Sequence, residues 1–134
     1  MDDKNPARNY PGSTPLHIAA HEGNFDICKL IIENVNDKNP ATQDGFTPLY
    51  IAAQKGHLKI CELIINQVED KNPAANCGNT PLHAAAKNGN LEIFKLISKF
   101  VEDMNPMNND GETPLTLAAK NNHFEILRIP CKRK

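Results

Sequence analysis

The tripeptide Thr-Pro-Leu occurs four times in this chain, beginning at Thr14, Thr47, Thr80 and Thr113, always 33 residues apart. Neighbouring positions keep the same phase, because an alanine pair follows each tripeptide and a glycine lies two positions ahead of it. Self-similarity at a fixed period of this length is the signature of an array of stacked units. The period therefore predicts an elongated array in which each unit contacts its neighbours along the chain.

The residue pattern of each unit predicts two short helices separated by a turn. The threonine hydroxyl can cap the first helix, and proline suits the first helical position because its missing N–H costs nothing there. The positions that can end this helix in the left-handed conformation are Gly23, Gly56, Gly89 and Asn122. Apolar residues then follow at helical spacing, as in Leu58, Ile60, Cys61, Leu63 and Ile64. Such short helices cannot bury their apolar faces alone, so the units must stack.

The run Thr80-Pro81-Leu82-His83, followed by an alanine pair and Gly89, resembles the ankyrin repeat, and His17 completes the same motif in the first unit. The resemblance covers nearly the whole chain. It implies an all-α solenoid of stacked helix–turn–helix pairs with projecting hairpin-like loops. We expect a single domain over residues 1–134, with units at about 14–46, 47–79, 80–112 and 113–131 and an N-terminal partial repeat at 1–13.

The sequence departs from the family pattern at several positions. Tyr50 and Thr116 replace the motif histidine, so we expect the hydrogen bonds between loops to differ there. Each loop contains Asn-Pro, which restrains the backbone and predicts a stiff connection. Pro130 interrupts the second helix of the fourth unit, where helix propagation is unfavourable by about 3 kcal/mol. The last unit is therefore predicted to be a short cap.

By resemblance, the protein-binding surface is the concave face of loop tips and first helices. The expected contact residues are Ser13, His21, Glu22, Gln43, Asp44, Phe46, Gln54, Lys55, Asn76, Cys77, Asn79, Lys87, Asn88, Asn109, Asp110, Glu112, Lys120 and Asn121. Phe46 is an aromatic residue on an otherwise polar face. It is either a binding hot spot or a side chain that packs locally on Tyr50 or a neighbouring loop.

The resemblance also implies a modification. Some ankyrin loops are substrates of an asparaginyl hydroxylase, and the partial matches here are Asn39, Asn72 and Asn105, each with aspartate two positions earlier. The alternative is that these asparagines only satisfy backbone groups of their loops, as asparagine does in many turns.

No residues in the sequence combine into a site for catalysis, metal or cofactor. Cys28 and Cys61 share one second-helix position, where a free cysteine acts as a small core hydrophobe. Cys77 lies in a loop and Cys131 in the tail, without a partner at metal-ligand spacing. The histidines follow the repeat, and the seven glycines are spaced as turn and cap residues rather than as a phosphate loop. We therefore expect no enzyme activity and no cofactor.

Charge limits the partners further. The chain has 15 Lys and Arg against 16 Asp and Glu, a net charge of −1, which argues against nucleic acid or an anionic membrane as the main partner. Charged residues interrupt the first 30 positions, so no signal peptide is predicted. We expect a monomer in the cytoplasm or nucleus that binds a protein, the alternative being a structural spacer within a larger protein.

Overall fold

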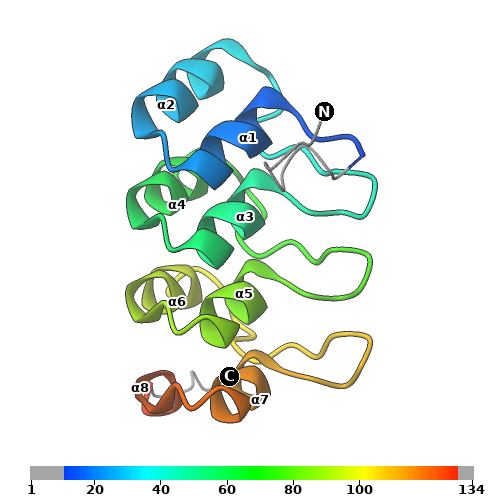
Figure 1. The fold of residues 1–134 in the computed structure, drawn as a ribbon, viewed down its shortest axis with the longest axis vertical. Coiled ribbons are helices and arrows are strands. Elements are labelled where there is room, and N and C mark those ends of the chain that lie inside the picture. The colour runs from blue at the N-terminus through cyan, green and yellow to red at the C-terminus, as the bar shows by residue number, and fades with distance from the viewer. Residues whose placement is uncertain (1–10, 130–134) are drawn as a thin grey trace, which may run out of the picture.

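The structure, a computed structural model, describes residues 11–129. In that range eight helices form four pairs, and no strand is present. The pairs are α1 (Pro15–Glu22) with α2 (Phe25–Asn34), α3 (Pro48–Lys55) with α4 (Leu58–Ile65), α5 (Pro81–Lys87) with α6 (Leu91–Ser98), and α7 (Pro114–Lys120) with α8 (Phe124–Leu127). Figure 1 shows the pairs stacked along the long axis, with loops projecting on the side of the first helices. The predicted all-α solenoid is confirmed.

The first helices begin where the motif predicts. The hydroxyl of Thr47 accepts from the backbone N–H of Tyr50 at 3.2 Å, and Thr80 does the same for His83 at 3.3 Å. Proline follows each threonine as the first helical residue. Each threonine thus satisfies one of the N–H groups that a helix start leaves without an intrahelical partner.

These helices also end as predicted. Gly56 has φ +81° and Gly89 has φ +72°, and Asn122 adopts the same left-handed conformation at φ +64°. A second requirement at Gly89 was not visible in the sequence. A Cβ built there would lie 2.6 Å from the His123 ring of the next pair, so the close approach of two pairs also favours glycine at this position.

The core runs through the stack as two columns of helices. In the first-helix column, Ala20, Ala53 and Ala86 are fully buried, and their small side chains let the helices approach closely. In the second-helix column, Ile64 and Phe94 are fully buried. The helix pairs contact their neighbours through both columns, which places the loop tips at regular intervals along one side.

The fourth pair is shorter than the others, as predicted. Helix α8 spans only four residues, and Phe124 and Leu127 remain 59% and 38% exposed. Pro130, on which the prediction was based, lies outside the described residues.

Candidate protein-binding surface

The loops form hairpin-like tips that are bonded to one another. Within the loop between α4 and α5, the N–H of Ala75 donates to the carbonyl of Asn79 at 2.8 Å. Between loops, Asn76 donates to the Asp44 carbonyl and Asn109 to the Cys77 carbonyl, both at 2.9 Å. These repeated hydrogen bonds form a ladder that joins the loop tips into a continuous edge.

The tips carry six of the predicted contact residues, and all six are exposed: Gln43, Asp44, Asn76, Cys77, Asn109 and Asp110. Two of them also have a structural role. The side-chain amide of Asn76 donates to the Gln43 carbonyl at 3.0 Å, and that of Asn109 to the Asn76 carbonyl at 2.9 Å. These asparagines hold the ladder together while one side of each faces solvent.

The ends of the first helices bring a second set of predicted contact residues together. Glu22, Gln54, Lys55, Lys87, Asn88, Lys120 and Asn121 are exposed there, and His21 is half-buried. The amides of Asn88 and Asn121 donate to carbonyls of their own helices, Ala84 at 3.0 Å and Leu117 at 2.8 Å. Lys55 and Lys87 remain as positively charged groups of this part of the surface.

The residues just ahead of the first helices are half-buried, namely Ser13, Phe46, Asn79 and Glu112. The Phe46 ring lies 4.8 Å from the Tyr50 ring, tilted by 53°. The structure therefore contains the local packing that was one of two interpretations of Phe46. Its role as a hot spot stays a prediction.

Glu112, just ahead of α7, and Lys120, at its end, form an ion pair with 2.7 Å between carboxylate and ammonium. The hydrogen bond from Lys120 lowers the pKa of Glu112, and the same bond raises the pKa of Lys120. Both side chains are accessible, and their charges largely neutralise each other on this part of the surface.

The motif histidines join each loop to the next. Nε2 of His17 lies 2.9 Å from the Phe46 carbonyl oxygen, and Nε2 of His83 lies 3.0 Å from that of Glu112. Burial lowers the pKa of both rings, which keeps them in the neutral form that suits this role. Thr116, which replaces this histidine, bonds through its hydroxyl to the Thr113 hydroxyl within its own pair at 2.9 Å.

The three candidate hydroxylation sites have the same structural role. The Asn72 side-chain oxygen accepts from the backbone N–H of Leu82 at 3.0 Å, and the Asn72 N–H donates to Asp70 at 3.1 Å. Equivalent bonds occur at Asn39 and Asn105. These contacts support the interpretation that the asparagines satisfy loop and helix backbone groups. Hydroxylation stays a prediction.

Two sets of structural residues were missed in the sequence. His57, Asn90 and His123 precede the second helices, and each reaches back to a carbonyl of the previous pair, as in the 2.7 Å contact of the Asn90 amide with Ala53. The sequence did contain a signal for this role, because the three residues occupy the same position of the 33-residue repeat. The second set is Lys38 and Lys71, whose ammonium groups donate to carbonyls at the end of the preceding second helix. Cations favour such a position because a helix C-terminus is electronegative.

The cysteines follow the sequence interpretation. Cys28 and Cys61 are fully buried, and burial raises the pKa of their thiols to about 11 and about 12. Cys77 is exposed at a loop tip. Cys131 lies outside the described residues. Across 11–129, no three His, Cys, Asp or Glu side chains are grouped so that they could hold a metal ion.

Among the described helices, none is long and apolar enough to cross a membrane.

Comparison with known proteins identifies the family. A family model described as ankyrin repeats (3 copies) matches residues 1–75 and again residues 64–131. No curated protein matches the chain in sequence. Ankyrin repeats generally act as protein–protein interaction modules. The family match, the 33-residue motif and the stack of helix pairs lead to one conclusion: the chain belongs to the ankyrin-repeat family.

Proposed function

We propose that the chain binds a protein partner through the surface formed by its loop tips and the ends of its first helices, and that it has no catalytic activity of its own. The observation that carries the proposal is the combination of a repeated frame and a varied surface. The frame repeats the same backbone contacts within and between its loops, whereas many of the exposed positions change identity from pair to pair.

The chemistry of the surface favours a polar partner segment. Lys55 and Lys87 are exposed on the helix ends, and Asp44 and Asp110 are exposed at the loop tips. A partner that offers both acidic and basic groups would complement these two rows. Such complementarity mainly raises the association rate and the specificity of a complex. We place this function inside the cell, in the cytoplasm or the nucleus.

The experiment compares charge reversal on two faces. A partner is first identified by crosslinking and mass spectrometry with the unmodified chain, and its affinity is then measured by calorimetry. The double variant Lys55→Glu/Lys87→Glu should weaken binding by about tenfold or more. The matched control Lys59→Glu/Lys95→Glu changes two exposed lysines on the second helices and should leave the affinity within about twofold.

Loss of affinity in the control and not in the test variant would place the binding surface on the second helices. If no partner is crosslinked at all, the chain acts as a structural spacer.

Phe46→Ala supplies a further test. A tenfold loss of affinity with unchanged thermal stability assigns Phe46 to the interface, and a fall in stability with unchanged affinity assigns it to packing on Tyr50.

A further inference from the structure

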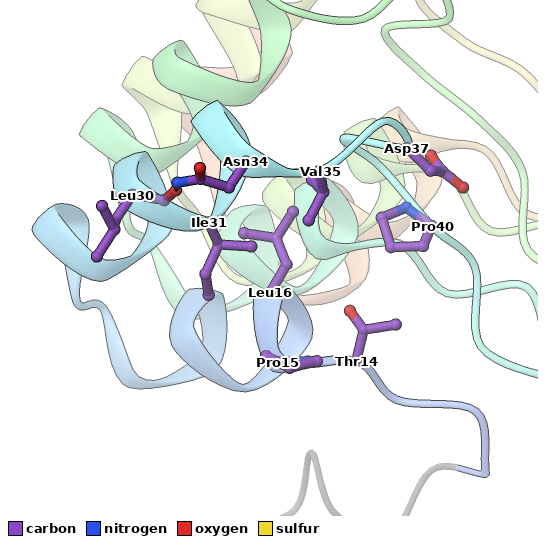
Figure 2. Close-up of a pocket in the computed structure, with 9 residues that line it drawn as sticks. All are labelled: Thr14, Pro15, Leu16, Leu30, Ile31, Asn34, Val35, Asp37 and Pro40. Atoms are coloured by element: carbon purple, nitrogen blue, oxygen red, sulfur yellow. Dashed lines mark hydrogen bonds between the residues drawn. The ribbon is translucent and has the colours of Figure 1, made fainter.

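The two ends of α1 differ in chemistry. Figure 2 shows Pro15 and Leu16 at its start, beside a largely apolar hollow of about 490 Å³. The last turn contains His21, which is half-buried. Among residues 11–129, both ring nitrogens of His21 are shielded from solvent and have no hydrogen-bond partner. A neutral imidazole has one N–H donor and one acceptor nitrogen, so the end of α1 holds a titratable group whose hydrogen-bonding capacity is unsatisfied.

The charged and titratable groups around His21 come from three elements. Glu22 is its neighbour on α1, and Lys55 lies in the last turn of α3. His57 precedes α4, with its Nε2 3.3 Å from the His21 carbonyl oxygen. Burial lowers the pKa of His21, and the charges of Lys55 and His57 lower it further, whereas Glu22 opposes them. The His21 ring is therefore uncharged at neutral pH.

The repeat position of His21 is exposed in the other three pairs, where the residues are Gln54, Lys87 and Lys120. The position therefore accommodates a polar side chain that faces solvent. Each first helix also has one basic residue in its last turn, which is Lys55 in the second pair. Only in the first pair is this residue a histidine, whose charge depends on pH in the physiological range.

We propose that His21 is a pH-sensitive switch within the partner surface, buried when neutral and turned outward when protonated. Protonation makes both ring nitrogens donors and adds a charge, which a buried site beside Lys55 disfavours and water accommodates. The electronegative C-terminus of α1 stabilises the imidazolium at the helix end. The first-helix ends then carry one more positive charge, so an acidic partner segment binds more tightly at acidic pH. The inference rests on the proposed function, since these helix ends are part of the proposed surface.

The first experiment is an NMR titration of the whole chain with labelled histidines, from about pH 8 to about pH 5. We expect the His21 ring to titrate below its ordinary pKa of 6.5 and the Lys55 amide shift to follow the same curve. A His21 ring that titrates at or above this value would overturn the proposal. Loss of the helical circular dichroism signal over this range would also overturn it, because the switch requires a folded stack on both sides of the titration.

The second experiment measures the affinity of a fluorescent octa-aspartate peptide, which stays largely ionised at about pH 5 because aspartate has a pKa of about 3.9. Its affinity for the unmodified chain should rise about threefold or more between about pH 7.5 and about pH 5. His21→Gln, which copies Gln54, should lose this rise. The matched control His57→Asn, which copies Asn90 at the same repeat position, should keep it.

The switch is wrong if the rise persists in His21→Gln or if the unmodified chain shows no rise. Either result leaves the proposed function standing, because that function is tested separately by crosslinking and by the Lys55→Glu/Lys87→Glu variant. Failure of the switch and failure of the partner surface are thus distinguishable.

Discussion

The third and fourth helix pairs begin with the same motif but differ in how deeply they are buried. In the third pair, every residue from Pro81 to Ala86 is buried and α6 runs for eight residues. In the fourth, α8 runs for four residues, and Leu127 is 38% exposed where Phe94 is fully buried. The third pair has described neighbours on both sides and the fourth on one, so the difference shows that burial in this array depends on neighbours as much as on the local motif.

The largest effect should come from truncating the same repeat position in the two pairs. Phe94→Ala leaves a cavity in the centre of the stack and should cost about 3–5 kcal/mol of unfolding free energy. Leu127→Ala removes a side chain that is already partly in water and should cost about 1 kcal/mol. Urea unfolding followed by circular dichroism measures both. Equal costs would contradict the claim that the fourth pair is the loosely packed one.

A smaller effect is expected from alanine at two glycines that share a positive φ. At Gly89, the new Cβ would meet the His123 ring and disturb its 3.0 Å contact with the Lys87 carbonyl. Gly111 has φ +77° and nothing within 4 Å of a built Cβ. Gly89→Ala should therefore cost about 2–3 kcal/mol and Gly111→Ala about 1 kcal/mol, the latter from the backbone alone.

These two variants are compared in the same urea titration. If Gly111→Ala proves as costly as Gly89→Ala, the left-handed backbone is the main requirement and the approach of His123 contributes nothing measurable.

The next test compares the pH dependence of stability that comes from His83, the motif histidine of the third pair, with that of a threonine, the residue found at the same position of the fourth pair. Burial lowers the pKa of His83 below its ordinary value of 6.5. The unfolded chain therefore takes up a proton before the folded chain does, so this contribution to stability is present above about pH 6.5 and is lost as the pH falls through the folded-state pKa. His17 and His21 have the same sign, with burial again the largest cause.

Unfolding free energies at about pH 7.5 and about pH 5.5 measure this loss. His83→Thr, which copies the residue found at position 116, should reduce the loss of stability on acidification. An unchanged pH dependence in this variant would show that His83 is not a source of it.

The last test, which disturbs the protein least, compares the reaction rate of thiols in the core with that of a thiol at a loop tip. In a Cys131→Ser background, Cys77 should react with a thiol reagent quickly and in the native state, because it is exposed. Cys28 and Cys61 should react only as the chain opens, since burial raises their pKa values. Rapid native-state reaction of all three thiols would contradict the buried assignment.

Much of the fold could be predicted from the sequence because the determinants are local and repeated. Thr80 and Pro81 specify a helix start through one side-chain bond and one fixed dihedral, and Gly89 specifies its end. The family resemblance then supplied the stacking arrangement and the expected contact residues. Most of those residues are exposed, although their binding role stays a proposal.

Other properties depend on residues far apart in sequence, and only the tertiary structure decided them. The side-chain amide of Asn90, for example, donates to the Ala53 carbonyl in the previous pair. The sequence alone determined the period, the helix boundaries and the apolar positions, because backbone dihedrals and capping act within a few residues. Contacts across pairs required the folded stack, because the distance between residues 29 to 37 positions apart is set by packing and not by local preference.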